Sequence, residues 1–458
     1  MNFMKPNELK GNAIIVIGGK WGDEGKGKIT SRFSKDADLV IRGTGGANAG
    51  HTIVFNGKKI ALHLVPGGIV YPKPICLIGQ GVVIDIPVLI KEIQTLEEMG
   101  VPNVRERLRI TGRAHIVLPY HKELDGLYEK FKENPVGTTK RGIGPTYMDM
   151  DARSGLRLYE ILQPIDKLTQ LIKEAVTPHN QLFEANGMPE CIVDPAKLAK
   201  EYHEYGEVLK PMLERNPDGL TSKAYREQWK VVVEGAQAFR LDKFYGDYPD
   251  VTSSNCVTTG TLTGAHLSHK MVDKVIVVIK AHDSRVGNGP FPTELPAHIA
   301  NNKVLPYDEP YPGDVIRENA HEFGATTGRP RRVGYLDAVI TATSKDVLGC
   351  DYLCVNHIDT LGEAGKQLGV VKMCVAYDYQ GQRINYYPDD VRLTGEVPTP
   401  VYEEFYGGWT VSRDTRKYED LPEMAKKYIE RLEEVTGCRV KYIGVGPDNE
   451  DLIVREDV

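Results

Sequence analysis

Short apolar runs recur along the chain and alternate with polar stretches that are rich in glycine. Residues 13–17, AIIVI, are mostly β-branched and predict a buried strand. A glycine loop follows this run, and an amphipathic pattern begins near Lys28, so the local order is strand, loop and helix. Comparable apolar runs predict further strands, several of them continuing into a loop, within 38–42, 75–85, 107–119, 231–242, 274–290, 351–359 and 372–379.

Helical patterns lie between these strands. Pro87 opens a predicted helix that extends to about Met99, because proline is favoured in the first turn of a helix. A polar helix is predicted over 120–133. Residues 156–230 are helical in pattern apart from Pro and Asn breaks, and a last helix covers about 421–436.

Buried strands that alternate with helices and glycine-rich loops predict an α/β protein. We expect a large, mostly parallel central sheet with flanking helices, a P-loop-like strand–loop–helix near its N-terminus, and helical and β insertions. No repeat, low-complexity linker or clear boundary divides the sequence, so residues 1–458 are interpreted as a single large domain. A mainly helical insertion is expected at about 156–230. A β excursion is expected at 53–70, with FNGKK as a hairpin turn, and residues 380–410 are rich in turns.

The composition is that of an ordinary globular protein, with 41% hydrophobic and 26% charged residues among 458. A net charge of -6 argues against general nucleic-acid binding, which requires a basic face. No apolar stretch approaches the roughly 20 residues of a membrane helix, and MNFMKPNELKGN does not resemble a signal peptide. Seven dispersed cysteines are typical of reduced thiols, so we expect a cytoplasmic protein without nucleic-acid or membrane partners.

The loop after the first strand is the strongest candidate for an anion site. Gly22, Gly27 and Lys28 match the spacing GxxxxGK, but the next residue is Ile29 instead of the usual Ser or Thr. Glycines let backbone N–H groups approach a phosphate, and a helix N-terminus favours negative charge. The loop also carries Asp23 and its neighbour Glu24, and acids in a phosphate cradle suit metal binding or proton transfer. A purely structural glycine turn is the alternative.

Two more loops carry polar groups among small residues. Residues 43–52, GTGGANAGHT, offer Asn48 and His51, and the shared edge of a parallel sheet predicts that His51 faces the phosphate loop. A surface histidine is the plain alternative. Residues 137–153 form a loop that we expect to be shaped and not helical, and a solvated surface loop is again the alternative. Its candidate phosphate contacts are Thr139, Lys140, Arg141 and Arg153.

The second half of the chain adds three candidate segments. Residues 231–242 predict a strand with Glu234 and Gln237 at its mouth, and 244–255 offer Thr252 among other hydroxyl and amide groups. The segment 325–332, ATTGRPRR, precedes an apolar helix and suits a loop that closes over a dianion, because arginine binds carboxylates and phosphates with paired hydrogen bonds. A solvated basic face is the alternative.

Asp359 follows a buried strand and lies three residues after Asn356. A carboxylate in this position can accept hydrogen bonds from N1 and N2 of guanine, and adenine lacks donors there. A helix cap is the alternative interpretation of the same residue.

Six strings in order, GDEGKGK, NAGHT, GTTKRGIGP, EGAQ with YPDVTSSN, TTGRPRR and VGPD, resemble the adenylosuccinate synthetase family. The resemblance covers residues 13–453 and is thin over 156–230 and 360–440. It implies GTP-dependent ligation of IMP and L-aspartate through 6-phosphoryl-IMP, with release of GDP and phosphate, in the first committed step from IMP to AMP. It also implies Mg²⁺ and a homodimer in which Arg153 reaches the neighbouring subunit's site.

The resemblance carries residue roles with it. Asp23 would take the N1 proton of IMP and bind Mg²⁺, His51 would be the acid at the GTP bridge, and the Gly50 carbonyl would complete the metal shell. Lys26 and Gln237 complete the implied catalytic set. The implied GTP contacts are Gly22, Asp23, Glu24, Gly25, Lys26, Gly27, Lys28, Arg331, His357, Ile358, Asp359, Gly444, Val445 and Gly446. The implied IMP contacts are Asp23, Lys26, Asn48, Ala49, Gly50, His51, Thr139, Arg153, Gln237, Thr252 and Arg329. The implied aspartate contacts are Ala325, Thr326, Thr327, Gly328, Arg329, Pro330 and Arg331.

Some positions depart from the family pattern, and other functions stay open. His357 replaces a lysine expected beside guanine, Ala238-Phe239-Arg240 replaces a GTL-like run, and Tyr335 replaces a tryptophan. A relative acting on another purine nucleotide is one alternative, although Asp23 favours IMP, whose N1 proton must be removed. A GTP-binding switch without ligase activity is another, and the missing Walker Ser/Thr argues against it.

Overall fold

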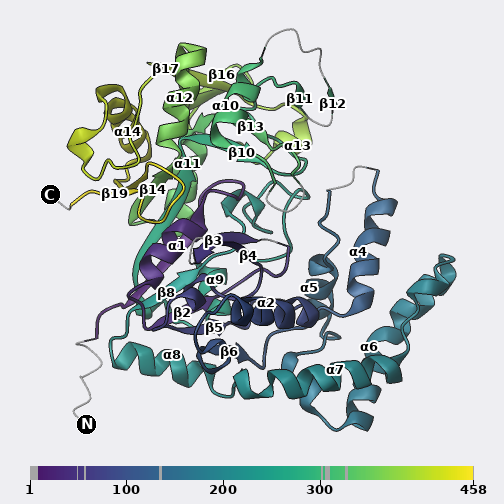
Figure 1. Cartoon of the computed structure of the whole chain (residues 1–458). Coiled ribbons are helices and arrows are strands. Elements are labelled where there is room, and N and C mark those ends of the chain that lie inside the picture. Colours follow the sequence, from purple (N-terminus) through teal and green to yellow (C-terminus); the bar gives the residue numbers. More distant parts are fainter. Residues whose placement is uncertain are drawn as a thin grey trace.

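A ten-stranded sheet runs through the centre of the computed structural model (Figure 1). The structure describes residues 9–48, 50–55, 58–133, 137–300, 303–304, 310–324 and 328–456. Neighbouring strands are parallel except for the edge pair β18 and β19. In spatial order the strands are β19 (Leu452–Val454), β18 (Val440–Gly444), β14 (Tyr352–Asn356), β9 (Val272–Lys280), β1 (Ala13–Gly18), β8 (Val231–Glu234), β2 (Leu39–Arg42), β5 (Ile75–Ile78), β6 (Leu108–Thr111) and β7 (Leu213–Glu214).

Strand β1 lies inside this sheet, between β8 and β9. Ile15 is in register with Val233 on one side and with Val275 on the other. Strands covered on both faces by helices read as continuous apolar runs, which is why the sequence pattern located them. Because the strands are parallel, the loops after β1, β2, β8 and β14 leave the same edge of the sheet. The predicted large, mostly parallel sheet is confirmed.

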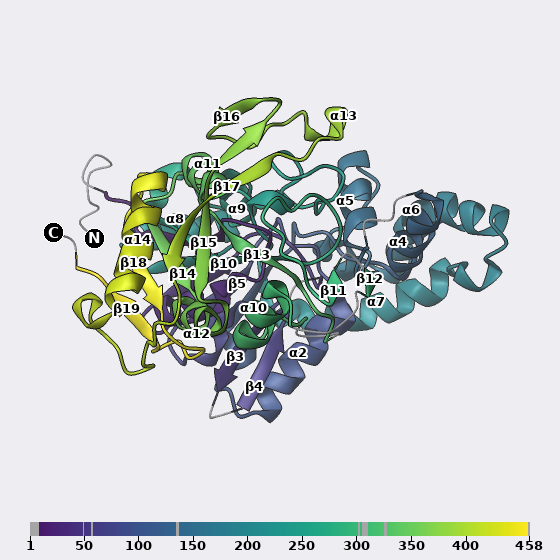
Figure 2. The same cartoon turned by 90° about the horizontal axis from the view of Figure 1, so that it is seen from above.

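Helices cover both faces of the sheet and extend beyond it. Figure 1 shows α6, α7 and α8 along the bottom of the view, and Figure 2 shows α6 and α7 projecting on the side opposite α14. The predicted helical character of 156–230 is confirmed. The helices are α1 (Lys26–Ser34), α2 (Ile86–Glu98), α3 (Val104–Arg107), α4 (Pro119–Phe131), α5 (Ile143–Ala152), α6 (Ile165–Ala185), α7 (Pro195–Leu209), α8 (Pro217–Arg226), α9 (Thr258–Gly264), α10 (Pro312–Ala320), α11 (Ala338–Leu348), α12 (Ile358–Leu368), α13 (Val391–Thr394) and α14 (Glu423–Thr436).

A smaller five-stranded sheet lies beside the C-terminal helices. It has the order β10-β13-β15-β16, and β17 also pairs with β15. Its strands are β10 (His282–Arg285), β13 (Arg332–Asp337), β15 (Val370–Tyr379), β16 (Gln382–Ile384) and β17 (Thr399–Tyr406). Two hairpins complete the fold: β3 (His51–Phe55) with β4 (Lys58–Leu62), and β11 (Ile299–Ala300) with β12 (Lys303–Val304). The β excursion predicted for 53–70 is therefore confirmed, whereas Asn56 and Gly57 of the predicted FNGKK turn lie outside the described residues.

Several local expectations were wrong. Helix α5 occupies 143–152, inside the segment predicted to be non-helical. Gly142 enters it with φ 73°, and Pro145 lies in the first turn, where a helix needs no N–H donor. The polar residues after β9 form β10, and β13 separates the arginine-rich segment from α11. The turn-rich region 380–410 contains β16, α13 and β17.

Two large apolar clusters fill the space between the sheet and its helices. One joins β1, β9 and β14 to α11, α12 and α14, and the other joins β2, β5 and β6 to α2, α4, α6 and α7. Within the described residues, none of the helices combines the length and the apolarity that crossing a membrane would require.

Candidate functional site

The loop between β1 and α1 is shaped by one of its own acids. Gly22, Asp23 and Gly25 have positive φ values of 93°, 59° and 84°, a conformation that is uncommon for a residue such as aspartate. Glu24 is fully buried, and its Oε1 accepts hydrogen bonds from the backbone N–H groups of Lys20 (3.2 Å) and Gly22 (2.8 Å). In this structure Glu24 therefore braces the loop and does not face solvent.

Asp23 is the acid that the loop presents outward. Its side chain is 44% exposed, and Oδ2 lies 3.0 Å from a terminal guanidinium nitrogen of Arg331. The other terminal nitrogen of Arg331 lies 2.8 Å from Glu322, and the Arg331 backbone N–H donates to the Glu322 carbonyl. The structure thus brings Arg331 of the arginine-rich segment to the N-terminal loop, where it pairs with carboxylates of the chain itself. Asp23 keeps its strained backbone in this contact, which is typical of functional sites.

A buried ionic cluster supports Arg331 from behind. Glu322 Oε1 lies 2.5 Å from Lys280 Nζ and 2.7 Å from His282 Nε2, and the three side chains are almost completely buried. Burial alone would raise the pKa of Glu322, but Lys280 and His282 hold it well below its usual range. Burial lowers the pKa of His282. Glu322 is therefore an ionised carboxylate, and it fixes one edge of the Arg331 guanidinium.

The two lysines of the GKGK string have different partners. Lys26 Nζ lies 2.7 Å from Glu24 Oε2. Lys28 Nζ donates to the carbonyls of Gly446 (2.7 Å) and Asp451 (2.8 Å), so it ties α1 to the turn that follows β18. Burial lowers the pKa of Lys28. The GxxxxGK spacing predicts a phosphate-binding lysine here, whereas the structure engages this ammonium with backbone carbonyls.

The end of β14 meets both the phosphate loop and the turn after β18. Asn356 Nδ2 donates to the Glu24 carbonyl at 2.7 Å. A β carbon on Gly444 would lie 2.3 Å from Asn356 Oδ1, so this close approach requires glycine. β14 ends at Asn356, and Asp359 lies in the first turn of α12 and not at a strand end. The helix cap position belongs to His357, so the capping alternative for Asp359 is not what the structure shows.

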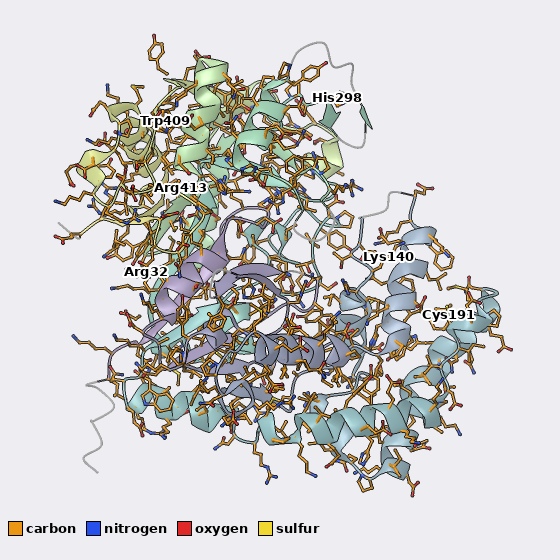
Figure 3. All side chains as sticks on the ribbon, in the orientation of Figure 1. Arg32, Lys140, Cys191, His298, Trp409 and Arg413 are labelled. Atoms are coloured by element: carbon orange, nitrogen blue, oxygen red, sulfur yellow. The ribbon has the colours of Figure 1, made fainter. Side chains whose placement is uncertain are left out.

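His357 and Asp359 sit in a poorly solvated environment. Burial, followed by the proximity of His282, lowers the pKa of His357 to about 3, and its Nδ1 is 3.2 Å from Thr360 Oγ1. Burial raises the pKa of Asp359, although Lys28 and Arg413 oppose this shift. Sequence reasoning missed Arg413, whose Cγ would lie 3.1 Å from a β carbon on Gly446. Figure 3 labels Arg413 in the C-terminal part of the molecule, below Trp409, which donates to the Ile358 carbonyl.

His51 lies next to the phosphate loop, as predicted. A β carbon on Gly27 would be 3.2 Å from His51 Cβ. His51 Nε2 is buried and lies 3.4 Å from Glu234 Oε1, too poorly aligned for a hydrogen bond. Burial lowers the pKa of His51 to about 3 and raises that of Glu234 to about 7. The sequence placed Glu234 at the mouth of its strand without identifying this partner.

Gln237 joins three of the predicted segments. Its Nε2 donates to Asn48 Oδ1 at 3.2 Å, and its Oε1 accepts from Ser254 Oγ at 3.1 Å. Ser254 and Thr252 hydroxyl oxygens are 3.5 Å apart. The loops after β2 and β8 and the segment 244–255 therefore converge on one amide. Of these residues, Asn48, Gln237 and Thr252 are the ones that the resemblance assigns to IMP.

Other predicted residues lie in exposed segments. Thr139, Lys140 and Arg153 are exposed, and Figure 3 places Lys140 between α4 and α5. Arg153 has φ 64° just after α5. Gly328 and Arg329 are exposed at the base of the arginine-rich loop, where the Gly324 N–H donates to the Arg329 carbonyl. Ala49, Ala325, Thr326 and Thr327 lie outside the described residues.

The chain is similar to known proteins along nearly its whole length. A family model described as adenylosuccinate synthetase matches residues 15–453. An adenylosuccinate synthetase of Acetivibrio thermocellus is 44% identical over 441 residues, covering 96% of this chain and 99% of the relative. That of Streptococcus gordonii is 43% identical over 447 residues, covering 97% and 99%.

Solved structures show the same likeness. A fully ligated adenylosuccinate synthetase from Plasmodium falciparum superposes with a TM-score of 0.86 at 34% identity, covering 97% of this chain and 100% of that one. A succinoaminodeoxyadenylate synthetase of cyanophage S-2L, bound to dGMP and dATP, has a TM-score of 0.58 at 16% identity, covering 98% and 96%. The second likeness concerns the fold alone.

Proposed function

The chain belongs to the adenylosuccinate synthetase family, and we propose from its geometry how the site joins IMP to L-aspartate at the expense of GTP. As a member of this family it is a ligase of AMP biosynthesis that uses GTP, IMP, L-aspartate and Mg²⁺. Asp23 follows β1, His51 follows the loop after β2, and Gln237 follows β8, so parallel strands bring their loops to one edge of the sheet, and this arrangement supports the mechanism below.

Asp23 is the general base of the proposed reaction. It is exposed, ion-paired with Arg331 and held in a strained backbone conformation beside the phosphate loop. Removing the N1 proton of IMP makes the purine O6 a nucleophile, and O6 then attacks the γ-phosphorus of GTP, whose bond to the bridging oxygen breaks so that GDP leaves. The product is 6-phosphoryl-IMP, in which phosphate is a far better leaving group than the original oxygen. The amine of aspartate displaces that phosphate at C6.

The donor set fits Mg²⁺, which prefers oxygen ligands and usually combines one or two carboxylates with substrate phosphates. Among the described residues, no group of three His, Cys, Asp or Glu side chains could hold a metal ion. The Asp23 carboxylate and the Gly50 carbonyl would therefore hold the ion together with the phosphates of the nucleotide. Bound there, Mg²⁺ would offset the negative charge of the phosphates.

The ligands are assigned to the segments that converge on this edge of the sheet. GTP phosphates bind the 22–28 loop and the N-terminus of α1, and guanine binds 357–359 and 444–446. The contact between Lys28 and Gly446 supports this assignment because it joins the two halves of the GTP site. IMP binds near Asn48 and Gln237 together with Thr139, Thr252 and Arg329, and aspartate binds the loop 325–331.

A homodimer supplies Arg153 to the neighbouring site. Arg153 follows α5 in an exposed position, and Met148 on the same helix is 54% exposed. The adjacent segment also carries exposed Phe244 and Tyr248. Ser253 Oγ would lie 3.3 Å from a β carbon on Gly144, so these apolar groups belong to neighbouring elements. Such a patch is typical of an interface.

The chain functions as a single domain in the cytoplasm. Strands from both ends of the sequence, β1 and β19, belong to the same ten-stranded sheet, which supports one large domain with an insertion at about 156–230. All seven cysteines are free, and free thiols are the usual state in a reducing compartment.

The test is to incubate the protein with IMP, GTP, L-aspartate and Mg²⁺ and to follow the ultraviolet spectrum of the purine. Formation of adenylosuccinate that depends on all three substrates is expected. GTP loss without a new purine product would favour a nucleotide switch. Turnover with GMP but not with IMP would favour a synthetase for another purine.

A further inference from the structure

The helical insertion at 156–230 lies outside the site described above, yet one of its helices contacts α5, the helix that precedes Arg153. Figures 1 and 2 show α4, α5 and α6 together on the side of the molecule opposite α14. On α5, Asp149 Oδ2 accepts a 2.6 Å hydrogen bond from the Tyr120 hydroxyl and lies 3.0 Å from His121 Nε2, and both partners belong to α4. Asp149 Oδ1 lies 3.5 Å from Nε2 of His179 in α6. One carboxylate therefore ties α5 to α4 and to the insertion.

The hydrogen positions in this cluster follow from its neighbours. The Leu118 N–H donates to His121 Nδ1 at 2.8 Å, so Nδ1 is the acceptor and Nε2 carries the hydrogen that faces Asp149. The Tyr120 ring stacks on the His179 ring, with centroids 4.5 Å apart. Burial alone would raise the pKa of Asp149, but hydrogen bonds with His121, His179 and Tyr120 hold it well below its usual range. Asp149 is therefore an ionised anchor whose partners are oriented by the fold.

The backbone of the same residue holds the turn that carries Arg153. The Asp149 carbonyl accepts hydrogen bonds from the N–H groups of Ser154 (2.9 Å) and Gly155 (3.0 Å), and also from that of Arg153. Arg153 has φ 64°, a left-handed conformation that is uncommon for residues other than glycine. Its exposed side chain thus leaves the surface from a backbone turn that Asp149 fixes.

A second contact holds the other face of α5. The Tyr147 hydroxyl donates to the Gly81 carbonyl at 2.7 Å, close to the loop after β5. Residues two positions apart on a helix lie roughly 200° apart around its axis. Tyr147 therefore anchors the sheet side of α5, whereas Asp149 anchors the side of the insertion. Loss of Asp149 should leave the helix in place and loosen the turn at its C-terminal end.

We propose that the Asp149 cluster, formed by Asp149, Tyr120, His121 and His179, is a positioning device that aims Arg153 at IMP in the neighbouring subunit. This inference rests on the proposed function, in which Arg153 binds IMP across a homodimer interface. A guanidinium binds phosphate through paired, directional hydrogen bonds, so a displaced backbone turn weakens the contact. Through His179, the helical insertion of one subunit supports substrate binding in the other.

The first experiment measures KM for IMP and kcat in the wild-type chain and three variants. For Asp149→Ala we expect KM for IMP to rise roughly tenfold to a hundredfold, with kcat changed less than about threefold. Asp149→Asn keeps an oxygen that can accept from Tyr120 and His121, so it should restore most of the affinity. Asn180→Ala is the matched control, because Asn180 follows His179 on α6 and its two hydrogen bonds to the Val193 backbone lie within the insertion. It should lower thermal stability and leave KM unchanged.

A double-mutant cycle tests whether Asp149 acts through Arg153. Arg153→Leu alone should raise KM for IMP. Adding Asp149→Ala to Arg153→Leu should cause no further rise, because the side chain that Asp149 positions is already absent. A further rise as large as that in the wild-type background overturns the inference.

Hybrid dimers test whether the effect crosses the interface. Asp149→Ala and Asp23→Ala subunits with different affinity tags are mixed, and dimers that contain one of each are purified. The site that keeps Asp23 then receives Arg153 from a subunit with an intact Asp149. We expect this site to show the wild-type KM for IMP. A KM as high as that of the Asp149→Ala homodimer overturns the inference, since the defect would then lie within the subunit that carries the substitution.

The proposals fail in different ways. A wild-type chain that forms no adenylosuccinate overturns the proposed function. In an active chain, an unchanged KM for Arg153→Leu overturns the role of that arginine and this inference together, whereas an unchanged KM for Asp149→Ala alone overturns only this inference. If Asp149→Ala does not fold, Tyr120→Phe takes its place, since it keeps the stacked ring and removes one hydrogen bond to Asp149. A smaller rise in KM is expected there, and no rise overturns the inference.

Discussion

Two buried glutamate–histidine contacts flank the site, and the pKa values of their carboxyl groups are shifted in opposite directions. Glu322 lies 2.7 Å from His282 and also contacts Lys280 and Arg331, so its pKa is well below the usual range. Glu234 lies 3.4 Å from His51 with one backbone donor described, and its pKa is raised to about 7. The same residue types thus form an ionised carboxylate on one side and a carboxyl group that ionises less readily on the other.

The number of donors decides the difference. Burial disfavours both carboxylates, but the charge of Lys280 and the hydrogen bond with His282 more than offset this cost for Glu322. The fixed charge suits a structural task, which is to hold Arg331 against Asp23. Four substitutions test whether this contrast governs activity and stability.

The largest effect should come from Asp23, the exposed acid that pairs with Arg331 of the Glu322 cluster. Asp23→Ala removes the carboxylate paired with Arg331, and we expect turnover to fall by roughly 10²–10⁴-fold or below detection while the chain stays folded. Adenylosuccinate formation and a thermal unfolding curve measure the two quantities. Asp36→Ala, at an exposed acid just after α1, should leave both unchanged. Near-normal turnover of Asp23→Ala would remove Asp23 as the base.

The second effect concerns stability. Glu322→Gln leaves Lys280 buried beside His282 without a negative partner, and we expect a loss of about 3–5 kcal/mol in the free energy of unfolding. Glu404→Gln removes an exposed contact with Lys372 and should cost less than about 1 kcal/mol. Urea unfolding at neutral pH compares the two variants. Equal losses would show that Glu322 is not a compensated buried charge.

The sequence predicted the fold only in part, and the strands show which elements hydrophobic patterns can and cannot locate. Continuous apolar runs located β1, β2 and β14 because those strands are covered on both faces. The same reasoning missed β10, since His282, Asp283, Ser284 and Arg285 are polar and nevertheless buried. Their charges are neutralised by groups far away in the sequence, such as Glu322 and Asp247. Hydrophobic periodicity contains no information about such pairing.

The site shows the same limit. Glycine patterns and acids in unusual places pointed to Asp23, His51 and Gln237, because such residues stand out against small neighbours. The long-range hydrogen bonds around the site could not be predicted in this way. Asn356 donates to the Glu24 carbonyl, and Lys28 donates to the Gly446 carbonyl. These contacts depend on the register of β14 and β18 in the sheet, which no local spacing encodes. The helix at 143–152 was missed because glycine and proline were interpreted as a loop signal.

The third effect tests the direction in which the fold shifts the pKa of Glu234. A carboxyl group whose pKa rises from 4.5 in the unfolded chain to about 7 in the fold costs stability as pH increases through this window. Glu234→Gln removes that cost, so the variant should gain stability relative to wild type between about pH 4.5 and 7, by roughly 3 kcal/mol in total. Glu322, with its lowered pKa, contributes stability that is lost when pH falls. Urea midpoints at several pH values measure both trends, and a pH-independent difference for Glu234→Gln would show that Glu234 is ionised in the fold.

The smallest effect should come from a substitution in the arginine-rich loop that leaves the buried Glu322 cluster intact. Arg329 lies two residues before Arg331 but is exposed, so Arg329→Leu should leave the Glu322 cluster and GTP binding alone unchanged. Loss of a charged hydrogen-bond donor to a carboxylate should raise KM for aspartate roughly tenfold to a hundredfold, which corresponds to about 1.5–3 kcal/mol. Arg332→Leu is the matched control, because Arg332 pairs with Glu294 and should affect stability more than KM. Initial rates against aspartate and IMP, with GTP binding measured separately, decide the matter. Unchanged KM values for Arg329→Leu would place substrate recognition in the buried cluster and not in the loop.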